Sequence, residues 1–152
     1  MIFVTVGTHQ QPFERLLGAL DTLPAGELVV QYGPGEPPAA QHAEAFMPFD
    51  AMLERFREAD TVITHAGVGS IICASREGHV PLVVPRRHEL GEHVDDHQVE
   101  LTRALAQRGS VVPVWDVEAL AETVSSAPPR QPKSTGAEPA LCPSVRGALL
   151  NR

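Results

Sequence analysis

The sequence predicts an α/β fold built on a doubly wound parallel sheet, and two observations support this. Short runs rich in β-branched residues alternate with segments whose apolar residues recur at the spacing of one helix face. Several of the β-rich runs end in glycine shortly before the next helical segment begins. Repeated alternation of strand and helix favours parallel strands joined by right-handed crossover connections.

The amino-terminal third begins this alternation at once. The β-rich run 2–6 is expected to form the first strand, which ends at Gly7. A helix is expected over 13–23, because the apolar residues there keep helical spacing. A second strand is expected over 27–32, and a short strand over 44–47.

The middle of the chain continues in the same way. Apolar residues at helical spacing predict a helix over 49–56. The run 61–64 is expected to be a strand, and a helix is expected over 70–77, ended by Gly78. The run 81–84 is expected to form the strand that follows.

The remaining elements are a long helix, a strand and a last helix. The long helix is expected over 94–108 and stops at Gly109. The strand is expected over 111–114. Asp116 is expected to cap the last helix, because its short carboxylate can accept a hydrogen bond from an unpaired amide of the first turn.

The composition changes at residue 127, where proline-rich linker sequence begins. We therefore expect one folded domain over 1–126 and a mobile tail over 127–152. A short docking helix is expected over 143–150.

Bulk properties narrow the classes of function. The 152 residues suit one domain, and the formal net charge of -7 argues against a nucleic-acid binder, which needs a basic face. The two cysteines, Cys73 and Cys142, do not make a disulfide framework and suit a reducing cytosol. No apolar run approaches the roughly 20 residues of a membrane span. The sequence therefore predicts a cytoplasmic protein.

Two glycine turns are candidate anion sites. The segments 7–9 (Gly-Thr-His) and 67–70 (Gly-Val-Gly-Ser) each follow a predicted strand and precede a predicted helix. Backbone N–H groups at a helix amino terminus favour a phosphate, and glycine lets a ligand approach them closely. The alternative is that these glycines only permit tight turns, and His9 and His65 are either ligand contacts or structural turn residues. The fingerprints of dinucleotide-binding and P-loop proteins are missing from the sequence, which disfavours a nicotinamide cofactor and ATP hydrolysis.

A charged loop after the strand 81–84 is a second candidate. Arg86 at its start could neutralise a diphosphate, or the loop could simply be solvated. His93 and His97 lie four residues apart, a spacing that leaves metal binding, a capping role and hydrogen bonds to a polar ligand open. Gln98 favours the last of these, because an amide offers both donors and an acceptor to hydroxyl groups.

Four motifs in this order resemble one family. They are 4–9 (VTVGTH), 65–70 (HAGVGS), 83–86 (VVPR) and 92–98 (EHVDDHQ). Together they resemble the carboxyl-terminal, donor-binding domain of family 28 glycosyltransferases. More narrowly, they resemble the stand-alone small subunits of two-component enzymes, among them bacterial exopolysaccharide glucuronosyltransferases and the eukaryotic dolichol-linked N-acetylglucosaminyltransferase. The resemblance covers about residues 1–125.

The resemblance implies half of a GT-B fold, a Rossmann-like domain that binds a UDP-sugar as donor substrate without a metal or another cofactor. The binding residues expected from the matched motifs are Gly7, Thr8, His65, Gly67, Gly69, Ser70, Arg86, Glu92, His93, His97 and Gln98. His9 is the local candidate for a general base, because a histidine near the cleft can accept a proton near neutral pH. Many family members hold the ribose with a glutamate on the helix after the second turn. The matching position here is Cys73, and Glu77 lies one turn further on.

The resemblance further implies that a partner is needed. GT-B enzymes hold the acceptor in a second domain, and only one domain fits in this length. We expect a membrane-anchored subunit that binds a lipid-linked acceptor and recruits this chain to the inner face of the membrane. The expected product is a polysaccharide or glycolipid. Two alternatives stay open: a non-catalytic nucleotide-sugar sensor or scaffold, and a metal-dependent hydrolase that uses His93, His97 and Asp95 or Asp96.

Overall fold

A computed structural model describes residues 1–8, 10–93 and 95–131. The docking helix expected over 143–150 and most of the tail expected over 127–152 lie outside the described residues. The domain boundary at residue 126 therefore stays a prediction.

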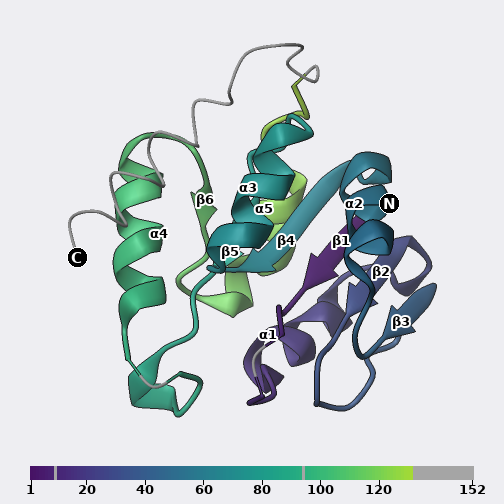
Figure 1. The fold of residues 1–152 in the computed structure, drawn as a ribbon, viewed down its shortest axis with the longest axis horizontal. Helices are drawn as coiled ribbons and strands as arrows, with labels where there is room; N and C mark the ends of the chain where they lie inside the picture. Colours follow the sequence, from purple (N-terminus) through teal and green to yellow (C-terminus); the bar gives the residue numbers. More distant parts are fainter. Residues whose placement is uncertain (9, 94, 132–152) are drawn as a thin grey trace.

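One parallel sheet forms the centre of the fold, and within the described residues it has six strands in the order β3-β2-β1-β4-β5-β6 (Figure 1). Their bounds are β1 (Ile2–Thr5), β2 (Leu28–Gln31), β3 (His42–Glu44), β4 (Thr61–His65), β5 (Leu82–Val84) and β6 (Val112–Pro113). The chain runs outward from β1 to β3, then returns to the other side of β1 with β4. This confirms the predicted doubly wound, Rossmann-like sheet and puts its topological switch point between β1 and β4.

Helices cover both faces of this sheet. The α-helices are α1 (Glu14–Ala19), α2 (Phe49–Glu58), α3 (Val68–Arg76), α4 (His97–Gln107) and α5 (Leu120–Ser125). Short 3-10 turns are η1 (Leu20–Thr22), η2 (Ala25–Glu27), η3 (His88–Leu90) and η4 (Val117–Ala119). In Figure 1, β3 lies at one edge of the sheet, and α4 stands beside β6 at the other.

The strands β1, β2 and β5 are buried on both faces, which explains their nearly continuous apolar sequence. Successive side chains alternate between the faces. Val4 of β1 joins a core cluster with leucines of α1 and α5, whereas Phe3 joins a cluster with α2 and α3 on the opposite face. There the ring of Phe3 meets the ring of Phe56 edge to face, with centroids 5.1 Å apart.

Three predicted boundaries need correction in the first two thirds of the chain. The strand expected over 44–47 is β3, His42–Glu44, because these residues pair in register with β2. The helix expected over 13–23 is α1 alone, and η1 continues it as a tighter turn. The helix expected from residue 70 begins at Val68, so the second glycine turn is itself part of the first helical turn.

The long helix also begins later than predicted. It was expected from residue 94, but α4 starts at His97, where the backbone N–H donates to Asp95 Oδ1 over 2.9 Å. His93 therefore precedes the helix and does not share a helix face with His97. Near the end of the domain, Asp116 accepts a hydrogen bond from the N–H of Glu118 over 2.9 Å, so it caps the 3-10 turn η4 that leads into α5.

The last described residues lie near the amino-terminal ends of the strands, opposite the carboxyl ends at which the glycine turns lie. Arg130 donates to the backbone oxygens of Arg57, Ala59 and Glu77, which lie at the carboxyl ends of α2 and α3. The N–H of Gln131 donates to Gly78 O over 2.8 Å. A guanidinium at two helix carboxyl termini is favourable because those ends carry partial negative charge. Across the described residues, no helix is long and apolar enough to cross a membrane.

Candidate functional site

The two predicted glycine turns lie next to each other at the carboxyl ends of β1 and β4, the adjacent strands at the switch point. They share one cavity of about 440 Å³. Its lining comes from Gly7, Thr8, Gln31, Phe49, Met52, Phe56, His65, Gly67, Gly69, Ser70, Ile72 and Cys73. The cavity thus joins both glycine turns with the apolar sides of α2 and α3. Open α/β sheets bind their ligands at this place in the fold.

The imidazole of His65 fills the space between the two glycine turns. A Cβ atom on Gly7 would lie 2.3 Å from His65 Nε2, and one on Gly67 would lie 2.3 Å from His65 Cε1. Carbon atoms normally approach no closer than about 3.5 Å. Gly7 also has a positive φ of 76°, which disfavours other residues at that position. Both glycines are therefore needed to seat the histidine, beyond permitting a tight turn.

The amino terminus of α3 opens on the cavity. Gly67 is the residue before the helix, and no side chain of the described residues caps it. The first backbone N–H groups of a helix have no partner inside the helix, and they favour an anion. A Cβ atom on Gly69 would meet nothing within 4 Å, so packing does not explain this glycine. Its open surroundings leave room for a ligand at the first turn of α3.

Gln98, near the start of α4, connects the ends of β4 and β5. Its Oε1 accepts hydrogen bonds from Arg86 N over 3.0 Å and from Ala66 N over 3.3 Å. Its Nε2 lies 3.4 Å from His65 Nδ1. The side chain therefore positions His65 and the second glycine turn. The contact with sugar hydroxyls implied by the family resemblance stays a prediction, and the oxygen already has two donors here.

Arg86 lies inside the domain and lines neither of the cavities described here, contrary to its expected place beside a diphosphate. Its side chain is fully buried and donates to the backbone oxygens of Val6, Gln11 and Glu92. The guanidinium also lies 4.6 Å from the centre of the Phe13 ring. Burial lowers the pKa of Arg86 to about 10, so it remains charged at neutral pH. Its charge holds the loops after β1 and β5 together.

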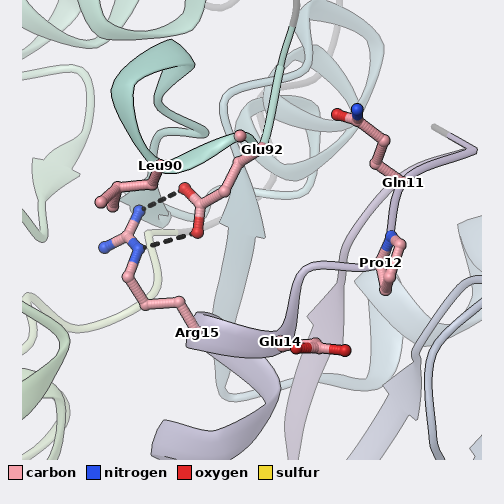
Figure 2. A pocket seen from close by; sticks show the side chains of 7 residues that line it. Gln11, Pro12, Glu14, Arg15, Leu90 and Glu92 are labelled. Atoms are coloured by element: carbon pink, nitrogen blue, oxygen red, sulfur yellow. Dashed lines mark hydrogen bonds and ion pairs between the residues drawn. The ribbon is translucent and has the colours of Figure 1, made fainter.

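Glu92 lines a second cavity of about 440 Å³, together with Gln11, Pro12, Glu14, Arg15, Leu90 and Gly91 (Figure 2). Its carboxylate accepts two hydrogen bonds from Arg15 of α1, each 3.0 Å long. It also accepts the backbone N–H of Arg87 over 3.1 Å. Glu92 is thus occupied within the protein, and its expected contact with a ligand stays a prediction.

The two histidines of the charged loop meet at one carboxylate. Asp95 lies 3.2 Å from His93 Nδ1 and 3.1 Å from His97 Nδ1. A backbone hydrogen bond from His97, together with the histidines' charge, lowers the pKa of Asp95. Within the described residues no group of three His, Cys, Asp or Glu side chains is placed to hold a metal ion. His97 is half-exposed and lies next to Gln98, near the carboxyl ends of the strands.

Some of the remaining candidates from the sequence line the cavity, and others lie away from it. Thr8 is exposed and lines the cavity, and His9 lies outside the described residues. Cys73 lines the cavity on α3, where burial raises the pKa of its thiol. Glu77 lies at the far end of α3 and pairs with Arg57 and Arg130. Of the two positions weighed for the ribose contact, only Cys73 reaches the cavity.

Sequence reasoning missed part of the cavity wall. Phe49 and Met52 of α2 were interpreted only as an amphipathic helix face, yet they line the cavity with Phe56. Gln31 falls within the expected strand 27–32, and a glutamine among apolar residues at a strand's carboxyl end is a detectable signal. Its side chain is fully buried and lines the same cavity.

Comparison with known proteins gives a family match that covers most of the chain. The glycosyltransferase family 28 C-terminal domain matches residues 1–140, which confirms the resemblance inferred from the four motifs. The UDP-N-acetylglucosamine transferase subunit ALG13 of Homo sapiens is 30% identical over 146 residues, covering 84% of this chain and 12% of the human protein. The protein of the same name in Yarrowia lipolytica is 28% identical over 137 residues, covering 79% of this chain and 67% of that protein.

A bacterial enzyme also matches over part of the chain. It is the UDP-N-acetylglucosamine–N-acetylmuramyl-(pentapeptide) pyrophosphoryl-undecaprenol N-acetylglucosamine transferase of Aromatoleum aromaticum. The two sequences are 36% identical over 97 residues, which cover 57% of this chain and 26% of the enzyme. The chain thus spans between about an eighth and a quarter of the length of the human and Aromatoleum relatives.

Proposed function

The chain belongs to the glycosyltransferase family 28 C-terminal domain, and on this premise we propose that it is the donor-binding half of a two-component glycosyltransferase. It binds a UDP-sugar in the cavity at the β1–β4 switch point. The sugar passes to a lipid-linked acceptor that a second, membrane-anchored chain holds. The names of the relatives specify UDP-N-acetylglucosamine, which supports an N-acetylhexosamine as the donor sugar.

One observation supports this proposal most strongly: the two glycine turns share a cavity, and the ring of His65 packs between them. The unpaired N–H groups at the start of α3 suit a diphosphate. The apolar wall from α2 and α3 suits the flat face of a nucleotide base. A phosphate site and an apolar slot in one cavity are the two parts that a nucleotide-sugar needs.

The charge of the cavity supports the need for a partner. Among the described residues that line it, none is Asp, Glu, Lys or Arg. The one arginine expected there, Arg86, is enclosed in the domain. The N–H groups and dipole of α3 offset only part of the charge of a diphosphate. We infer that a cation from the second chain completes the site when the two chains assemble.

The reaction that we propose is a displacement at the anomeric carbon of the sugar. The acceptor oxygen forms a bond to that carbon, and the bond from the carbon to the diphosphate breaks. The electron pair leaves on UDP, whose charge the start of α3 stabilises. The proton of the acceptor hydroxyl passes to a base. His9 is the last residue of the first glycine turn in the sequence and remains our proposed local base.

Titration calorimetry of the full chain with UDP and UDP-N-acetylglucosamine tests this function. We expect weak binding of both and no detectable sugar transfer by the chain alone. The variant Gly67→Ala should lose binding, because its methyl group displaces His65. Gly26→Ala is the matched control, since a Cβ there meets nothing within 4 Å. A flat titration of the wild-type chain against both ligands would refute the proposal.

Reconstitution with the acceptor-binding chain separates a catalytic subunit from a sensor. The pair should transfer sugar to a lipid-linked acceptor. Binding of the nucleotide without transfer by the pair, with several UDP-sugars tried, would favour a nucleotide-sugar sensor or scaffold instead.

A further inference from the structure

Gln31 carries the clearest unexplained polar group in the cavity. The residue ends β2, and its side chain is fully buried while it lines the cavity. Its Nε2 has no hydrogen-bond partner in the part of the chain that the structure describes. A buried donor without a partner costs about 1–3 kcal/mol. Such a group in a ligand cavity is explained if a bound ligand supplies the missing acceptor.

The hydroxyl group of Thr5 fixes the orientation of the Gln31 amide. Thr5 pairs with Gln31 in the register of β1 and β2. The hydroxyl of Thr5 accepts the N–H of Gly7 over 3.2 Å and donates to Gln31 Oε1 over 2.6 Å. The threonine has one hydroxyl proton, and this hydrogen bond uses it. Because Oε1 is held by Thr5, the NH2 group of the amide is the part left for a ligand.

The position of Gln31 relative to α3 indicates which part of a bound nucleotide would contact its amide. β2 and β4 are separated by β1, so Gln31 lies two strand spacings, roughly 10 Å, from the end of β4 and the start of α3. Phe49 and Met52 of α2 line the same cavity, and Ile72 of α3 faces it as well. An anion at the start of α3 therefore leaves the rest of the nucleotide among apolar side chains, with one amide donor beside it.

We propose that Gln31 is a specificity residue that donates a hydrogen bond to the C4 keto oxygen of a uracil base. This inference rests on the proposed function and extends it to the choice of base. A keto base such as uracil presents an acceptor to the amide. Cytosine has an amino group where uracil has its second keto oxygen, and two facing donors repel each other. The buried NH2 group then stays unpaired, which makes the site reject the wrong base.

Titrations with UDP and CDP test this proposal, because the two ligands differ only in the base. The full wild-type chain should bind UDP about tenfold more tightly than CDP, the size expected for one buried hydrogen bond. Gln31→Met keeps the volume of the side chain and removes the donor, so it should bind the two ligands about equally. Gln41→Met is the matched control, since Gln41 is exposed and lies away from this cavity.

A second variant keeps the test valid if Gln31→Met does not fold. Thr5→Val preserves the shape of the threonine but releases the amide oxygen, so the amide can turn and the preference for UDP should fall. Equal losses of UDP and CDP binding in the variants, or an unchanged preference for UDP, would overturn the role of Gln31 in base choice. Failure of the wild-type chain to bind either ligand would instead overturn the proposed function.

Discussion

Replacing Gly67 by alanine should damage both the stability of the domain and its nucleotide site. The backbone of Gly67 has φ −87° and ψ 130°, angles that alanine adopts without strain, so any effect comes from the methyl group alone. That methyl group would lie 2.3 Å from His65 Cε1 and 2.5 Å from Nε2. The shortfall against normal contact is more than about 1 Å. Gly7 is less suitable for this test because its positive φ would add backbone strain.

The magnitude follows from the surroundings of the imidazole. His65 packs against Gly7 on its other side and lies beside Gln98 Nε2, so it cannot move without disturbing one of them. Overpacking of a buried site typically costs about 1–3 kcal/mol of unfolding free energy. We expect a loss of about 2 kcal/mol in urea unfolding and at least about tenfold weaker binding of UDP in calorimetry.

A double-mutant cycle tests the physical reason. His65→Ala removes the ring that the methyl group meets. The double variant should therefore be more stable than the sum of the two single changes predicts, by about 1–2 kcal/mol. Gly26→Ala should change the unfolding free energy by less than about 0.5 kcal/mol. Additive effects in the cycle, or unaltered stability of Gly67→Ala, would show that His65 does not fill the space between the turns.

Three further predictions concern other parts of the domain. Burial lowers the pKa of His79 below its ordinary 6.5, so the unfolded chain takes up the proton first and the domain should lose stability as the pH falls below about 6.5. Urea midpoints at pH 5 and 7.5 measure this loss, and His79→Asn should abolish it. The partly buried pair of Arg15 and Glu92 should show a coupling of about 1 kcal/mol in a double-mutant cycle of Arg15→Met and Glu92→Gln, and no coupling would mean that the ion pair is not formed. Because burial raises the pKa of the Cys73 thiol, iodoacetamide should modify this thiol slowly at pH 7.5 in a Cys142→Ser chain. Bound UDP should slow the modification of Cys73 further, because Cys73 lines the cavity. A modification rate that UDP does not change would place the nucleotide elsewhere.

The sequence predicted the fold well, because the relevant information is local. Hydrophobic periodicity distinguishes strands from helices, and alternation implies a parallel sheet. The turns that begin at Gly7 and Gly67 lie next to each other because they follow β1 and β4, two adjacent parallel strands whose carboxyl ends share one edge. Boundaries were less certain. The start of α4 depends on a hydrogen bond to Asp95, and such caps are decided by the geometry of the loop.

The directions of single side chains could not be predicted in this way. An arginine after a strand can face solvent, a ligand or the interior. Arg86 points into the domain because it donates hydrogen bonds there to the backbone oxygens of Val6 and Gln11. These partners are distant in sequence, so no local pattern records them. The same holds for His65, which packs against glycines that follow two different strands, and for Gln31, whose amide is oriented by a threonine on the neighbouring strand.

Backbone amide shift mapping during a titration with UDP-N-acetylglucosamine tests the central claim most directly. The account predicts that the largest shifts in a 15N-labelled chain come from Gly7, Gly67, Gly69 and Ser70, which surround the β1–β4 cavity. Amides such as Gly91, beside the second cavity, should remain nearly unchanged. Shifts centred on the second cavity, or none at all at millimolar nucleotide, would contradict the account.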